Sequence, residues 1–404
     1  MNKNSIVGIS LLFASSCLHA DMDYSVQING YSTFTVHPDI TSLPAEQGPP
    51  DYLWQESIDI RLISTWYATD NGFAELHYHA GLFATLLTGQ GNPDFDTGLG
   101  ASSGLYRMDD LDPKPWIDIA GDSGFYLEQN LDRMNWTQYF PVADVSIGRQ
   151  TINLGTARFI SPTDVFRPNN IDHLVSDYAP GIDAIRAQFP VGDLSTLDIG
   201  HIMGASRSQG ASFAKLKSSV IATDLSFTGI RLFEKQILSA GVESSVGQFG
   251  LWQELALLTS NNQQDVRWSF GFDATIVNYL AQVELHINQP GDSTAANYLT
   301  NAAEDPFYQQ GVIGFFGQHY VAGSFAWLDG IRSAHDVTMI VNIDDYSSLT
   351  ILSYSFSLSD NWGLEGTMNL PIGDAPEMVN DELVPGSEFG TYPFVLMLKI
   401  EGNI

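Results

Sequence analysis

Residues 352–359 read Leu-Ser-Tyr-Ser-Phe-Ser-Leu-Ser, so a serine follows every apolar side chain. A β-strand places successive side chains on opposite faces, and this stretch therefore predicts a strand with one apolar and one polar face. Asp360 and Asn361 then supply a tight turn, after which the alternation resumes from Trp362 to Leu370. A helix would distribute these serines around its axis, so we interpret the segment as a β-hairpin.

The same alternation recurs at residues 58–66, 74–82, 267–276 and 281–288. It is typical of strands in an outer-membrane barrel, where one face meets lipid and the other surrounds water. The polar members that we expect to line the lumen are Asp59, Arg61, Glu75, His77, His79, Arg267, Asp273, Glu284, His286 and Glu365.

A soluble β-sandwich would also alternate, and two details favour the barrel over it. Aromatic residues such as Trp66, Trp268 and Trp362 fall near the ends of the expected strands, where an interfacial girdle belongs. The chain also ends within an alternating segment, residues 392–404, which resembles the C-terminal signal of outer-membrane barrels, although Ile404 replaces the usual Phe.

The amino-acid composition also favours a membrane barrel. Charged residues make up 16% of the chain, against roughly 25% in soluble domains. Hydrophobic residues make up 44%, yet outside the first twenty residues no run approaches the ~18 apolar residues of a membrane helix. The apolar residues are therefore dispersed, as they are when every second side chain faces lipid.

Residues 1–20 are expected to be a signal peptide that directs the chain to the outer membrane. Lys3 precedes a short apolar stretch, and Leu18-His19-Ala20 offers a cleavage site. A weak lipobox ending at Cys17 keeps lipidation open as an alternative. Cleavage after Ala20 removes the only cysteine, which would exclude thiolate metal sites and covalent haem.

The chain is strongly acidic. It carries a formal net charge of −30, and loss of the first twenty residues, which hold one lysine and no acid, leaves −31. Such a field repels nucleic acid and attracts cations. Acidic loops that bind divalent cations beside lipopolysaccharide are an equal alternative. We expect no cofactor, apart from loose Ca²⁺ on these loops.

We expect residues 21–404 to form a single all-β domain, a transmembrane antiparallel barrel with long extracellular loops. A bacterial single-chain barrel needs an even strand number. Seventeen segments alternate, so we expect about 16 strands, with 14 and 18 open. The segments are 24–35, 54–68, 72–85, 126–140, 143–151, 180–189, 194–203, 218–230, 236–246, 249–259, 266–276, 279–288, 308–317, 319–328, 347–359, 361–371 and 391–404.

The connections alternate between short and long. Short turns are expected at 69–72, 190–193 and 360–361. Loops longer than about a dozen residues are uncommon in compact domains and usually carry function. The long ones are expected at 36–53, 86–125, 152–179, 289–307 and 372–390.

Residues 148–189 concentrate charge in a chain with only 17 Lys and Arg residues. We expect this loop to fold into the barrel mouth, where its ion pairs would narrow the lumen, since Arg pairs bidentately with carboxylates. A loop packed on the rim and a specific ligand site are the alternatives. The residues of this constriction are expected to be Arg149, Arg158, Asp164, Arg167, Asp172, Asp177, Asp183 and Arg186.

The pattern GRQTINLG…R…SPTDVFRP…PGIDAIR in residues 148–186 resembles a motif of porin-like outer-membrane proteins of Gram-negative bacteria. The resemblance covers about forty residues and implies an outer-membrane barrel with a channel or scaffold role. It implies no substrate. Comparable barrels sheath multihaem cytochromes, but this chain has no CxxCH, so any haem would belong to a partner.

Other motifs are weaker. The His77-x-His79 pair with Glu75 could bind a metal, but lining of the lumen is the preferred interpretation. Residues 121–124 resemble a serine-protease motif without a partner His and Asp, and residues 94–98 resemble a calcium loop that lacks its final Glu. Neither GxGxxG nor Walker A patterns occur, so dinucleotide and ATP binding have no support, and for want of a credible catalytic triad we expect no enzyme.

Two functions remain. The first is a passive pore for small hydrophilic solutes, biased toward cations, which the barrel assembly machinery would insert into lipid and lipopolysaccharide. The alternative is a scaffold for a periplasmic or surface partner, such as a multihaem cytochrome or an export apparatus.

Overall fold

The computed structural model describes residues 21–404 except 41, 44–47, 90–105, 109–123, 167–180, 207–208, 261–262 and 381. The signal-peptide prediction, residues 1–20, lies outside the described residues.

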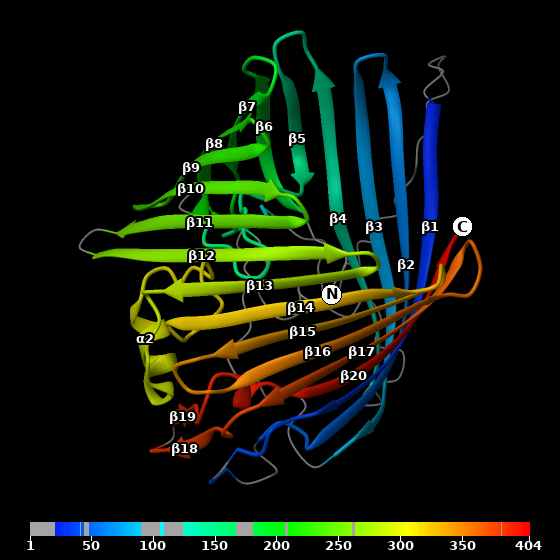
Figure 1. Ribbon diagram of the computed structural model, residues 1–404. Helices are drawn as coiled ribbons and strands as arrows, with labels where there is room; N and C mark the ends of the chain where they lie inside the picture. The colour runs from blue at the N-terminus through cyan, green and yellow to red at the C-terminus, as the bar shows by residue number, and fades with distance from the viewer. Residues whose placement is uncertain are drawn as a thin grey trace, which may run out of the picture.

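Eighteen strands form one antiparallel sheet (Figure 1). They are β1 (Asp21–Val36), β2 (Tyr52–Thr69), β3 (Gly72–Thr88), β4 (Phe125–Tyr139), β5 (Asp144–Gln150), β6 (Ile182–Pro190), β7 (Ser195–Ile202), β8 (Ala211–Val220), β9 (Thr223–Leu232), β10 (Lys235–Val246), β11 (Phe249–Ser260), β12 (Gln263–Ile276), β13 (Tyr279–Asn288), β14 (His319–Asp329), β15 (Ser333–Asn342), β16 (Ser348–Ser357), β17 (Trp362–Ile372) and β20 (Phe394–Asn403).

The sheet closes on itself. Each strand from β1 to β17 pairs with the next, and β20 pairs with both β17 and β1. The first and last strands meet in the register Gln27↔Asn403 to Val36↔Phe394. Closure leaves the sheet without an unpaired edge, which is the condition for strands to cross a bilayer. The predicted barrel is therefore confirmed.

The two ends of the barrel differ. Short turns join the strands at one end, as at residues 70–71, 221–222 and 277–278, and β1 begins and β20 ends there. Long connections occupy the other end, where the helix α2 (Tyr298–Glu304) and the small hairpin β18 (Glu377–Val379)–β19 (Glu382–Val384) lie (Figure 1). Short turns are periplasmic and long loops extracellular in such barrels.

The outer face of the barrel is apolar. On β2, Ile58 and Ile60 are exposed, whereas Asp59 between them is 5% exposed. On β12, exposed Phe270 and Phe272 alternate with buried Ser269 in the same way. A soluble protein would bury such a belt, so it identifies the surface that faces lipid. Among the described residues, no helix is long and apolar enough to span a membrane.

The core of the molecule lies inside the barrel, on its extracellular half. Loop residues Leu154, Val165 and Phe307 pack there against inward side chains of the wall, such as Ile237 and Leu258. A second cluster joins loop residues Ile160, Phe315 and Phe389 to β14–β16. The inner face is therefore not polar throughout, because several loops need an apolar wall on which to pack.

The predicted number of about 16 strands is too low, and three segments account for the difference. Residues 308–317 alternate but belong to a loop, because Val312 and Phe315 are buried in the two clusters. The strands β8 and β15 were missed. Ile221 and Ala222, which turn the chain from β8 to β9, adopt positive φ angles of 44° and 58°, so the turn lacks the usual Gly or Asn.

Candidate functional site: the lumen and its inner loop

Residues 151–166, here called the inner loop, follow β5 and lie against the inner face of β11–β13. The carboxylate of Glu254 on β11 accepts the backbone N–H groups of Thr156 at 2.6 Å, Ala157 at 2.8 Å and Thr163 at 3.1 Å. It also accepts the hydroxyl groups of Ser161 and Thr163. One side chain of the wall therefore holds both ends of residues 156–163.

A second carboxylate holds the middle of the same segment. Glu284 on β13 accepts the backbone N–H groups of Arg158 at 2.9 Å and Ile160 at 2.8 Å. The indole Nε1 of Trp252 donates to the same group at 2.7 Å. On β12, the Ser269 hydroxyl donates to the carbonyl of Ile160 at 2.6 Å. The inner loop is thus fixed by side chains from three adjacent strands.

Both glutamates are 1% exposed, so water does not solvate them. Burial of a charge is costly unless hydrogen bonds replace its hydration. Each carboxylate here accepts at least four donors, and bonds to an ionised acceptor are about twice as strong as neutral ones. The N–H groups of the loop therefore replace the hydration of the two carboxylates. The carboxylates in turn hold the loop in place.

Arg158 directs its guanidinium away from these carboxylates. Its side chain is 48% exposed, lies 3.3 Å from Glu243 and stacks over the ring of Trp252 at 5.3 Å. Lys217 lies 3.9 Å from the same glutamate, on β8. A positive side chain of the inner loop thus faces the remaining lumen, where it can meet a dissolved ion.

The opposite wall, formed by β1–β4, β17 and β20, carries paired charges on its inner face. Arg61 lies 3.3 Å from Asp132, and His77 lies 2.7 Å from Glu75. On β20, Lys399 lies 3.4 Å from Glu365. This wall is polar, which suits contact with water and small solutes.

All ten residues that we expected to line the lumen lie on inward positions of their strands. Three of them do not reach the lumen, because Arg267, Glu284 and His286 are only 1–2% exposed. Glu284 binds the inner loop, and Arg267 donates to the carbonyl of Pro162 at 3.4 Å. His77 and His79 contact different carboxylates, Glu75 and Asp59. No group of three or more His, Cys, Asp or Glu residues in the described part of the chain could hold a metal ion.

The residues expected at the constriction are divided among several places. Arg149 on β5 pairs with Asp183 on β6 at 3.0 Å, and Arg186 pairs with Asp198 on β7 at 2.6 Å, so these ions belong to the wall. Within the inner loop, Arg158 is exposed and Asp164 is buried. Arg167, Asp172 and Asp177 lie outside the described residues.

Glu254 was missed at the sequence level. It stands in the sequence Leu-Trp-Gln-Glu-Leu-Ala-Leu-Leu, residues 251–258, where the inward set Trp252, Glu254, Ala256 and Leu258 is mostly apolar. Such a strand shows no clear polar face, so a single glutamate carries no signal. Its loop partners lie more than ninety residues away in sequence.

A third buried carboxylate joins the extracellular loops. Glu388, between β19 and β20, accepts the N–H of Phe316 at 2.9 Å, Nδ2 of Asn342 at 2.7 Å and the hydroxyl of Tyr320. Its own N–H donates to Asp345 at 2.7 Å. Burial, assisted by the negative charge of Asp345, raises the pKa of Glu388 to about 7.

This loop contact is expected to weaken as the pH rises. The pKa of Glu388 is raised above the ordinary value of 4.5, so its stabilisation is complete below pH 4.5 and is lost as the pH passes 7. Hydrogen exchange of the Phe316 amide should therefore accelerate above pH 7 relative to Glu388→Gln, which cannot ionise. Equal acceleration in both proteins would contradict the expectation.

The closed barrel and its exposed apolar belt define a transmembrane β-barrel of the outer-membrane class, with loops that fill part of its interior. No family model matches the chain, and no curated protein matches it significantly. Solved structures match its fold over nearly their whole length.

Three of these structures illustrate the likeness. A BenF-like porin from Pseudomonas fluorescens has a TM-score of 0.56 at 10% identity, with 95% of this chain and 98% of that chain covered. Acinetobacter baumannii OccAB2 has a TM-score of 0.53 at 10% identity, with the same coverage. Pseudomonas aeruginosa OpdK with vanillate has a TM-score of 0.51 at 9% identity, again with the same coverage. At such identities the likeness concerns the fold.

Proposed function

We propose that this protein is an outer-membrane channel through which small hydrophilic solutes diffuse passively. The observation that carries this proposal is the inner loop, which Glu254 and Glu284 fix inside a closed barrel. A rigid internal segment sets the width of the passage, while polar walls replace part of the hydration of a passing solute.

We further propose a modest preference for cations. The chain has 47 acidic residues against 17 basic ones, and a negative potential around the openings raises the local concentration of cations. Arg158 opposes this preference locally, because its half-exposed guanidinium faces the lumen. The bias therefore comes from the whole charge distribution and is reduced at the inner loop.

Single-channel recording in planar bilayers tests the proposal. We expect ohmic steps, with a reversal potential in a salt gradient that indicates modest cation selectivity. Absence of conductance from the folded barrel would refute the channel, and anion selectivity would refute the bias. A stoichiometric partner retained during purification from native membranes would favour the scaffold alternative instead.

Neutralising Arg158 should make the channel more selective for cations. In Arg158→Gln the lumen loses a positive charge next to Glu243. The reversal potential should therefore shift further toward the equilibrium potential of the cation. The matched control is Arg231→Gln, since Arg231 is exposed on the outer side of β9. An equal shift in both variants would show that Arg158 does not meet the permeating ions.

A further inference from the structure

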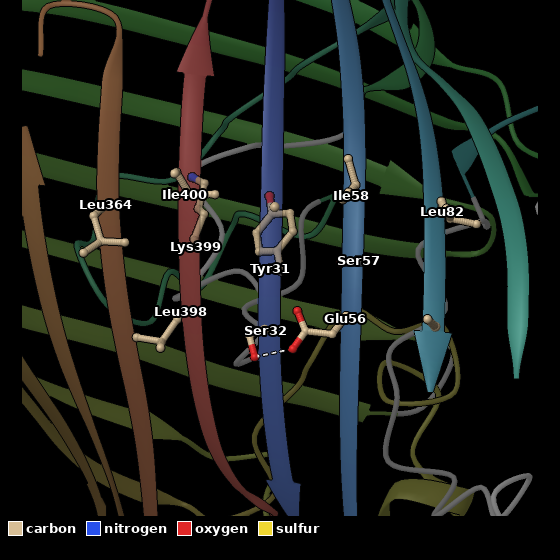
Figure 2. A pocket seen from close by; sticks show the side chains of 12 residues that line it. Tyr31, Ser32, Glu56, Ser57, Ile58, Leu82, Leu364, Leu398, Lys399 and Ile400 are labelled. Carbon is tan, nitrogen blue, oxygen red and sulfur yellow. Dashed lines mark hydrogen bonds between the residues drawn. The ribbon is translucent and has the colours of Figure 1, made fainter. Parts of the chain in front are cut away.

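The lipid-facing surface holds a hollow of about 400 Å³ across five strands, β17, β20, β1, β2 and β3 (Figure 2). We call it the lipid notch. Its apolar lining consists of Gly30, Ile58, Leu82, Leu364, Leu398 and Ile400.

Gly30 creates the hollow. It pairs with Ile58 on one side and Ile400 on the other, so all three positions lie on the same outer face. A Cβ atom at Gly30 would lie 3.1 Å from Cγ2 of Ile400, which shows how closely the neighbouring side chain borders the gap. The adjacent side chains Tyr31 and Lys399 belong to the inner face, beside Asp59.

One end of the lipid notch carries a carboxylate on the outer face. Glu56 lies two residues before Ile58 on β2 and therefore on the same outer face. Its Oε1 accepts the hydroxyl of Ser32 at 2.7 Å (Figure 2). The same atom accepts the indole Nε1 of Trp54 at 2.9 Å. Acidic side chains toward lipid destabilise a barrel. Both bonds reach Oε1, so Oε2 can accept a donor from a bound lipid, which would lower this cost.

The depth of Glu56 restricts the ligand. Trp54, two residues nearer the extracellular end, is a girdle-type residue and marks the level of the lipid head groups. Two strand residues span about 6–7 Å, so Glu56 lies below that level, where acyl chains join their head group. Because the long loops of such barrels are extracellular, this end of the barrel lies in the outer leaflet of the membrane.

Glycolipids of the lipid A class fit this depth. Their acyl chains carry amide N–H and hydroxyl groups near the sugar, whereas the ester-linked chains of a phosphatidylcholine offer no hydrogen-bond donor there. We propose that the lipid notch binds an acyl chain of a lipid A-type glycolipid, with Glu56 accepting a hydrogen bond from the hydroxyl or amide at the root of that chain.

Native mass spectrometry of the detergent-solubilised barrel with added lipid A tests this. The wild type should retain one lipid A per chain. Gly30→Val, which narrows the hollow at its centre, should weaken binding by about tenfold, equivalent to 1.4 kcal/mol. Gly30→Ala, which adds one methyl group, should weaken it less. Gly229→Val is the matched control, because Gly229 pairs with exposed Leu238 on the outer face of the far wall and has room for a Cβ.

Glu56→Gln should weaken the binding of lipid A and leave that of dioleoylphosphatidylcholine unchanged. Conductance and heat-modifiable migration report folding, and both should match the wild type since neither residue faces the lumen. Equal binding of lipid A by Gly30→Val and wild type would overturn the proposal. Equal affinity of the wild type for lipid A and dioleoylphosphatidylcholine would overturn it as well. Failure of the channel proposal would appear separately, as a wild type without conductance.

Discussion

Replacing Glu254 and Glu284 together with alanine is expected to free the inner loop and raise the single-channel conductance. The double variant leaves eight loop donors without their acceptor: the N–H groups of residues 156–160 and 163, and the hydroxyl groups of Ser161 and Thr163. Each unsatisfied buried donor costs about 1–3 kcal/mol, so the loop should leave the wall and hydrate.

Conductance and its noise measure this release directly, because a loose loop both widens the passage and fluctuates within it. The matched control is Glu365→Ala, which removes an inward carboxylate that pairs with Lys399 on the opposite wall and has no bond to the inner loop. A folded double variant with wild-type conductance and quiet current would show that residues 156–163 do not limit the passage.

Strands whose inner face is polar carry the clearest signal in the sequence. β16 and β17 show this best. Their serines and Thr367 lie on the inner face, whereas exposed Tyr354 and Leu364 lie on the outer face. Where loops pack against the wall, the inner face is itself apolar and alternation fades. In β8, for example, Phe213 is buried on the inner face, while Leu216 is exposed on the outer face.

The candidate site could be predicted in outline only. The charge density of residues 148–189 indicated a loop that folds inward, and Glu284 was recognised as an inward residue. The sequence could not show that the loop is held by carboxylates of the far wall, because these contacts join residues 91–126 positions apart. The expected Arg–Asp pairs formed instead between neighbouring strands, as Arg186 and Asp198 do.

The ion pair of Arg149 and Asp183 connects the two strands that flank the inner loop, and its loss is expected to destabilise the barrel. Asp183 binds Nε and Nη2 of Arg149 at 3.0 and 3.2 Å, and Arg149 is 5% exposed. Asp183→Asn removes the negative charge that binds this buried guanidinium. Breaking a buried pair in this way costs about 3–5 kcal/mol.

Urea unfolding of the barrel in lipid vesicles, followed by tryptophan fluorescence, measures the loss. Asp224→Asn is the matched control, because Asp224 and its partner Lys217 are 36% and 48% exposed and such pairs contribute about 1 kcal/mol or less. Combining Asp183→Asn with Arg149→Gln also removes the buried positive charge and should restore part of the stability. If Asp183→Asn were as stable as the control, water would have to reach Arg149, and the base of the inner loop would be open to solvent.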